Sequence, residues 1–113
     1  MIEMSHEIRG DVLILRPAKR IDSSTAKSFE EQANELVDAG PKKVVIDFSA
    51  VEYISSAGLR VVLTTAKRAK SAGGALTLSG VSSNVKEVFD VSGFAAIFGM
   101  HDTPEEAVAA LKG

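Results

Sequence analysis

Two adjacent serines, Ser55 and Ser56, are the residues of this sequence whose types and position are best suited to chemistry. They follow an apolar stretch of strand length that ends in Asp47-Phe48, and they precede a segment with helical periodicity. The first N–H groups of a helix have no partner within the helix and carry a partial positive charge. A phosphoryl group is well accommodated at such a position. Ser56 is therefore a chemically suitable acceptor for phosphorylation.

Two other interpretations of Ser56 stay open on the residues alone. A serine at the start of a helix is most often only a cap for the free N–H groups. A catalytic serine is the second, because a strand followed by Ser56 and Gly58 imitates part of the nucleophile elbow G-x-S-x-G. Position 54 is isoleucine instead of the first glycine of that motif, and His101 is the only downstream histidine that could act as a base. We therefore expect that the protein is not an enzyme.

Composition limits the classes to which the chain can belong. Its 113 residues, 45% hydrophobic and 25% charged, are typical of one globular domain, 1–113. A formal net charge of −2 argues against nucleic-acid binding. The chain has no cysteine, which excludes a disulfide scaffold and a cysteine metal site, and its two histidines, His6 and His101, are isolated. We expect no metal and, because the glycine-rich phosphate loops are missing, no cofactor.

The chain carries no sign of membrane insertion or export. No stretch approaches the roughly 18 apolar residues that a membrane-spanning helix needs. The first residues, Met1–Glu7, are acidic and lack the apolar core of a signal peptide. We therefore expect a cytoplasmic protein with no membrane span. A monomer is expected as well, because no apolar helix stripe is left over for self-association.

The apolar periodicity predicts an α/β domain with elements in the order β-β-α-β-α-β-α-β-α. The first half of the chain has two predicted strands within residues 2–17, with a turn at Arg9-Gly10-Asp11 and an end at Pro17, then a helix 23–39 capped by Ser23 or Ser24 and a strand 43–48. A helix from the serine pair to Gly73-Gly74 and a strand 75–79 follow. The last predicted elements are a helix from Ser82 or Ser83 to about Gly93, an edge strand 96–98, and a helix begun by Thr103-Pro104. Alternating strands and helices imply right-handed crossovers and a largely parallel sheet. The opening hairpin makes the sheet mixed.

Three segments of the chain follow the pattern of a known family. An apolar strand with Asp-x-Ser-x-Val, Val45–Val51, precedes the serine turn Tyr53–Leu59; Ile21-Asp22 precedes the first helix, and Val85–Phe94 forms a later helix and turn. In this order they resemble the STAS domain of bacterial anti-sigma factor antagonists, and the resemblance covers roughly residues 3 to 111. It implies a single STAS-like domain whose mixed β-sheet has helices mainly on one face.

The resemblance also implies a function. Such proteins bind an anti-sigma factor with serine kinase activity, and this binding releases the sigma factor for RNA polymerase. The kinase phosphorylates a serine of the antagonist, which then dissociates, and a metal-dependent phosphatase restores it. The family's target serine corresponds here to Ser56. The residues expected to contact the partner are Asp22, Ser55, Ser56, Ala57, Gly58 and Arg60.

The sequence departs from the family pattern at two places. Ser55 stands where the family usually has aspartate, so it is the second choice for the modified residue. Lys19-Arg20 stands where the family often has Gly-Glu, which implies a different fit to the kinase. An alternative function stays open: an accessory or scaffold subunit of a signalling or transport complex, in which Ser56 is only a cap and phosphorylation plays no part.

Several neighbouring residues have a structural and a functional interpretation. Asp22 orients the serine or the kinase, or it caps the first helix. Gly58 allows a partner to approach closely, or it satisfies helix packing. Arg60 and Lys67 meet an acidic partner, or they form a solvated helix face. Because a phosphate supports a helix N-terminus, we expect it to act by excluding the partner and not by unfolding the protein.

Overall fold

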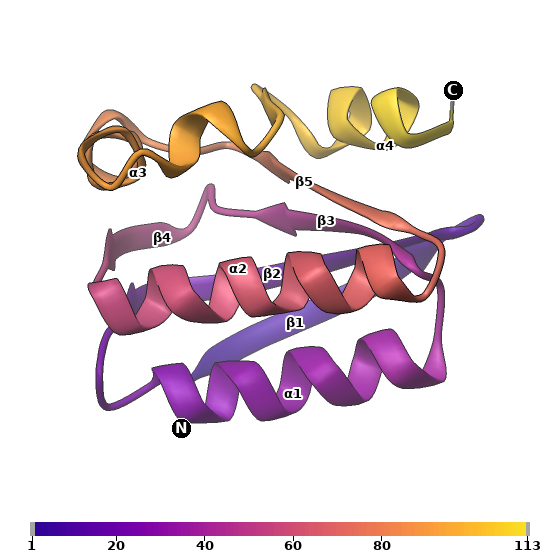
Figure 1. Cartoon of the computed structure of the whole chain (residues 1–113), viewed down its shortest axis with the longest axis horizontal. Coiled ribbons are helices and arrows are strands. Elements are labelled where there is room, and N and C mark those ends of the chain that lie inside the picture. The colour runs from indigo at the N-terminus through magenta and orange to yellow at the C-terminus, as the bar shows by residue number, and fades with distance from the viewer. Residues whose placement is uncertain (1, 113) are drawn as a thin grey trace.

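The sheet is organised around its second strand, which has neighbours along both edges (Figure 1). The computed structural model describes residues 2–112. Its strands are β1 (Glu3–Arg9), β2 (Val12–Ile21), β3 (Lys43–Asp47), β4 (Val51–Ile54), β5 (Ala75–Ser79) and β6 (Met100–His101). β1 pairs with β2 antiparallel, and all the other pairs are parallel, in the order β1-β2-β3-β5-β6 with β4 beside β2. The predicted mixed sheet is confirmed.

Helices cover both faces of this sheet, most of them on one side. They are α1 (Ala26–Ala39), α2 (Ser56–Ser71), α3 (Ser83–Val91), the 3-10 turn η1 (Phe94–Ala96) and α4 (Pro104–Lys112). The larger core combines apolar residues of α1, α2 and α3, and the smaller one lies under α4. Leu13 and Leu15 of β2 face the larger core, whereas Val12 and Ile14 face the smaller one. This explains the unbroken apolar run at the start of β2, because that segment is covered on both faces.

The second strand is longer than expected, and the prediction that Pro17 ends it is wrong. β2 continues to Ile21 because its second half pairs with β4, through Lys19–Ile21. Its pairing with β3 stops at Leu15 and its pairing with β4 begins at Lys19. Pro17 therefore lies in the gap between the two parallel ladders and has a ladder partner only on the β1 side, Met4. The structure also has a strand that the sequence does not predict, β4, in the segment between the end of β3 and the serine pair.

Two local predictions near helix ends are also corrected. The edge strand expected at 96–98 is the turn η1 followed by Ile97, and the short edge strand lies later, at β6. Neither Ser23 nor Ser24 caps α1, because the helix begins at Ala26 after Thr25. The caps of the last two helices agree with the prediction: Ser82 caps α3 and Thr103 accepts a hydrogen bond from the Glu106 N–H.

The helices α1 and α2 lie side by side and run in the same direction (Figure 1). An ion pair joins the C-terminal ends of the two helices. Arg68 of α2 donates hydrogen bonds to the Asp38 carboxylate of α1, from Nε at 2.8 Å and from Nη2 at 2.6 Å. The hydrogen bonds and charge of Arg68 hold the pKa of Asp38 below its ordinary value. Such a pair stabilises the fold above the unfolded-state pKa of about 3.9, and this stabilisation is lost as the pH falls through the lower folded-state pKa.

The variant Asp38→Asn is therefore expected to lose stability less steeply than the unaltered chain between about pH 5 and pH 2. Urea unfolding followed by circular dichroism at a series of pH values measures this slope. The variant Arg68→Gln removes the cation instead and is expected to give the same shallower profile. If Asp38→Asn lost stability in acid as steeply as the unaltered chain, the ion pair would not be the source of the effect.

Candidate functional site

Ser55 and Ser56 lie at the junction of β4 and α2, where their hydroxyl groups have different surroundings. Ser55 is the N-cap of α2, and its side-chain oxygen accepts a hydrogen bond from the Gly58 N–H at 3.2 Å. The Ser55 backbone N–H donates to the Ile21 carbonyl oxygen at 2.8 Å. Ser56 is the first residue of the helix and is exposed. Within residues 2–112 no hydrogen bond engages the Ser56 hydroxyl, so the capping role belongs to its neighbour.

This division of roles predicts unequal costs for two otherwise identical substitutions. Ser55→Ala removes the cap and is expected to lower the free energy of unfolding by about 1 kcal/mol. Ser56→Ala removes an unbonded, exposed hydroxyl and is expected to change it by less than about 0.5 kcal/mol. Chemical denaturation of both variants measures the difference. A larger cost for Ser56→Ala than for Ser55→Ala would show that the two roles are reversed.

Asp22 lies at the same corner, because the Ser55–Ile21 hydrogen bond joins the end of β2 to the start of α2. Its carboxylate accepts hydrogen bonds from the Ser24 hydroxyl at 2.6 Å and from the Ser24 N–H at 2.9 Å, and Arg20 Nε lies at 3.4 Å. The Ser24 hydroxyl, the Ser24 N–H and Arg20 lower the pKa of Asp22 below its ordinary value. Asp22 is thus an ionised carboxylate that shapes the turn before α1.

Gly58 is buried against the strands that precede it in sequence. A Cβ atom at this position would lie 2.7 Å from Ile21 Cγ2, 2.8 Å from Ile54 Cγ1 and 3.0 Å from the Ile21 carbonyl oxygen. Such distances are too short for carbon atoms in contact, so the packing of α2 requires glycine here. The packing interpretation of Gly58 thus has direct geometric support. Ala57 beside it is half-buried and packs against the larger core.

The Ser56 side chain borders two shallow hollows between α2 and the α3–η1 segment. One has a volume of about 260 Å³ and is bordered by Ser56, Leu59, Arg60, Leu63, Ser92 and Phe94. The other has a volume of about 330 Å³ and is bordered by Ser56, Asn84, Glu87, Val88, Val91 and Ser92. The side chain of Val91 is 82% exposed, which is unusual for a large apolar residue. Ser56 thus lies within a partly apolar surface.

Tyr53 is a second exposed side chain of this region, in β4 just before the serine pair. Its side chain is 41% exposed, and the guanidinium carbon of Arg20 lies 4.3 Å from the centre of its ring. Tyrosine and arginine are enriched at protein interfaces. The sequence interpretation missed Tyr53, Val91 and Phe94 as candidate site residues. Tyr53 lies close to the serine pair in the chain and could have been named, whereas Val91 and Phe94 are brought to Ser56 only by the fold.

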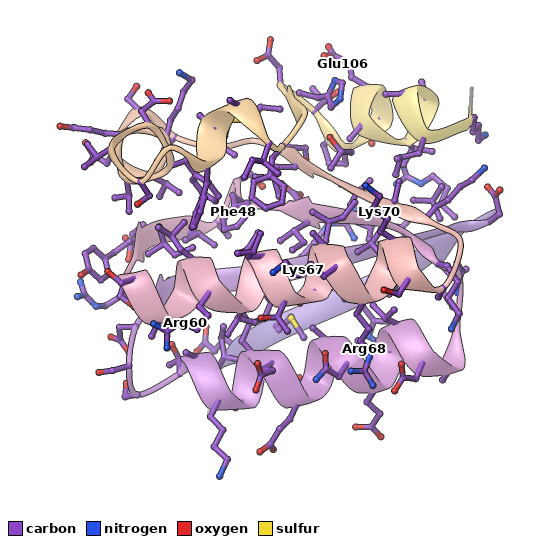
Figure 2. All side chains as sticks on the ribbon, viewed as in Figure 1. Phe48, Arg60, Lys67, Arg68, Lys70 and Glu106 are labelled. Carbon is purple, nitrogen blue, oxygen red and sulfur yellow. The ribbon has the colours of Figure 1, made fainter. Side chains whose placement is uncertain are left out.

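Arg60 and Lys67 are exposed on α2, and within the described part of the chain neither forms a salt bridge. Figure 2 shows both side chains on this helix. Arg60 borders a hollow next to Ser56, whereas Lys67 borders a different hollow further along the helix. Only Arg60 is therefore brought to the serine site.

The surroundings of Ser56 offer little for catalysis. Neither hollow beside it is bordered by a histidine, and His101 lies in β6 at the edge of the sheet. Within residues 2–112 no group of three or more acidic or histidine side chains is arranged to hold a metal ion. Over the same residues no helix is long and apolar enough to cross a membrane.

Comparison with known proteins agrees with this geometry. Residues 3–107 match the STAS domain. BtrV of Bordetella bronchiseptica, which is named as an anti-sigma factor antagonist, is 42% identical over 92 residues, covering 81% of this chain and 79% of BtrV. A crystal structure from Thermotoga maritima, of a protein named in the same way, has a TM-score of 0.91 at 28% identity and covers 97% of this chain and 95% of that one.

The fold is also shared with SpoIIAA, an anti-sigma factor antagonist. Its unphosphorylated form has a TM-score of 0.85 at 20% identity, covering 98% of this chain and 97% of that one. The phosphorylated form of SpoIIAA from Bacillus has a TM-score of 0.73 at 17% identity, covering 97% and 98%. The match over residues 3–107 places this chain in the STAS domain family.

Proposed function

We propose that this protein is an anti-sigma factor antagonist: it binds an anti-sigma factor with serine kinase activity, releases the sigma factor, and is switched off by phosphorylation of Ser56. The general role is supported by the names of relatives that match most of the chain, BtrV first among them. The choice of Ser56 rests on one observation, which is that its exposed hydroxyl is unbonded whereas the hydroxyl of Ser55 is engaged as a cap.

The environment of Ser56 suits a phosphate group in the modified protein. Ser56 is the first residue of α2, where the N–H groups of the first turn and the helix dipole favour an anion. Arg60 lies one helical turn later and forms no salt bridge among the described residues, so it is free to approach the phosphate. Phosphorylation is therefore compatible with an intact α2, as the exclusion mechanism requires.

The same environment explains why a phosphate would prevent partner binding. Ser56 borders two hollows, one of which it shares with the exposed Val91. A partner that covers these apolar side chains also buries Ser56. A phosphate at that point would lose its hydration against the partner, and Arg60 alone balances only part of its charge of about −1.5 to −2. The remaining unmatched charge costs about 2–5 kcal/mol at the interface. One modification is then enough to release the partner.

The proposal is tested by isolating the partner from the native cells with a tagged copy of the unaltered chain. The expected partner has a serine kinase domain, and in the presence of ATP and Mg²⁺ it should phosphorylate the unaltered chain but not Ser56→Ala. If the partner had no kinase activity and bound equally well whatever the state of Ser56, the accessory or scaffold function would replace the present proposal.

A further inference from the structure

A third hollow lies along α2, beyond the surface that contains Ser56. Its volume is about 510 Å³, compared with about 260 and 330 Å³ for the two hollows at Ser56. Small-molecule sites typically measure about 300–1,000 Å³, so this hollow falls well within their range. It lies between the second half of α2, the start of β5 and the segment after η1. Leu63 borders both this hollow and the smaller one beside Ser56.

The floor of this hollow is apolar. Its apolar side chains are Leu63, Ala66, Ala75, Leu76, Ile97 and Phe98. Phe98 is anchored in the larger core, where its ring packs edge-on against Phe89 with the ring centres 5.9 Å apart. Ile97 is 60% exposed, so the apolar surface continues to the rim. An apolar tail bound in this hollow would cover the Ile97 side chain, which is otherwise exposed to water.

The rim of the hollow carries two lysines, Lys67 and Lys70, three residues apart on α2. Figure 2 shows both on this helix, with Lys70 directed toward β5 in that view. Seven other cations of the described chain form salt bridges with carboxylates: Arg9, Arg16, Lys19, Arg20, Lys43, Arg68 and Lys86. Within residues 2–112 Lys67 and Lys70 form none, so both ammonium groups are available to an external anion.

We propose that this hollow binds a small amphiphilic anion, with its aliphatic or aromatic tail on the apolar floor and its carboxylate, sulfonate or phosphate head at Lys67 and Lys70. An apolar floor with two unpaired cations on one side is complementary to such a molecule and not to a neutral or cationic one. A nucleotide is not favoured, because its polyphosphate requires a glycine-rich cradle of N–H groups that this segment of α2 does not offer.

The probe for this proposal is decanoate, used below its micelle-forming concentration and titrated into the full chain labelled with ¹⁵N. Chemical-shift changes that saturate and centre on Leu63, Lys67, Leu76 and Ile97 are expected. Decyltrimethylammonium has a tail of the same length and the opposite charge, and it is expected to bind at least tenfold more weakly. Decanoate shifts that do not saturate, or that centre elsewhere, would overturn the proposal.

Two double variants separate the site from bulk charge. Lys67→Glu with Lys70→Glu is expected to weaken decanoate binding at least tenfold. Lys27→Glu with Lys112→Glu makes the same change in net charge at exposed positions outside the hollow and is expected to leave binding within about twofold. The ¹⁵N spectra of both variants report whether the fold is intact. If the two double variants weakened decanoate binding equally, decanoate would be attracted by the net charge of the protein and not by a site in this hollow. The test needs no anti-sigma factor, so its result is independent of the proposed function.

Discussion

Replacing Ser56 with glutamate is expected to weaken binding of the anti-sigma factor partner about thirtyfold or more. The charge enters a surface that the partner covers, at the border of the two hollows and beside Val91 on α3. A desolvated, unmatched charge at an interface costs about 2–5 kcal/mol, and each 1.4 kcal/mol is a factor of ten in affinity. The free energy of unfolding is expected to change by less than about 0.5 kcal/mol, because an acidic residue in the first turn of a helix is well tolerated.

The chain offers a closely matched control for this experiment. Ser83 is also exposed, is also the first residue of its helix, and also follows a serine that caps that helix. Ser83→Glu therefore adds the same charge in the same local setting, outside the two hollows that Ser56 borders. Isothermal titration calorimetry with the purified partner is expected to give near-normal affinity for Ser83→Glu and for Ser56→Ala. Equal affinity of Ser56→Glu and the unaltered chain would contradict exclusion at this surface.

Replacing Gly58 with alanine is expected to lower the free energy of unfolding by about 1–3 kcal/mol, the usual cost of overpacking a core. The added methyl group would meet Ile21 and Ile54 side-chain atoms at 2.7 and 2.8 Å, and the Ile21 carbonyl oxygen at 3.0 Å. Alanine favours a helix over glycine by up to about 1 kcal/mol, which offsets part of this cost. Since α2 has to move away from β2 and β4, Ser55 and Ser56 are expected to move with it.

A double-mutant cycle tests the cause of this destabilisation. Ile21→Ala removes the side-chain atom nearest to the new methyl group, so the double variant is expected to be less destabilised than the sum of the two single variants. Urea denaturation of the three variants measures the coupling. If the losses in the free energy of unfolding were strictly additive, the steric contact with Ile21 would not be the source of the cost. If Gly58→Ala left the free energy of unfolding unchanged, the packing of α2 would not require glycine at this position.

The sequence was sufficient to predict features that depend on neighbouring residues. The run Val12–Leu15 predicted a strand covered on both faces, and Thr103-Pro104 predicted the start of the last helix. The serine pair was correctly placed at a helix start, although which serine forms the cap depends on backbone geometry at one residue. The cap is Ser55, with an extended backbone, and Ser56 already belongs to the helix.

Features that depend on distant segments were not predictable in the same way. β4 has two exposed and two buried residues, and it becomes a strand only because the far half of β2 lies beside it. The same pairing carries β2 past Pro17. The surface around Ser56 combines α2 with Val91 and Phe94, which lie more than thirty residues later in the chain. No local periodicity encodes such a contact between distant segments.

The central claim is that Ser56 is the regulated residue, and phosphopeptide mapping of the protein from its native cells tests it most directly. Samples are compared across growth and stress, with the phosphate located between Ser55 and Ser56 by fragmentation of the peptide. The account predicts phosphate on Ser56 in an amount that changes with conditions, because only its hydroxyl is free and exposed at the start of α2. Phosphate on Ser55 alone, or no phosphate under any condition, would contradict it.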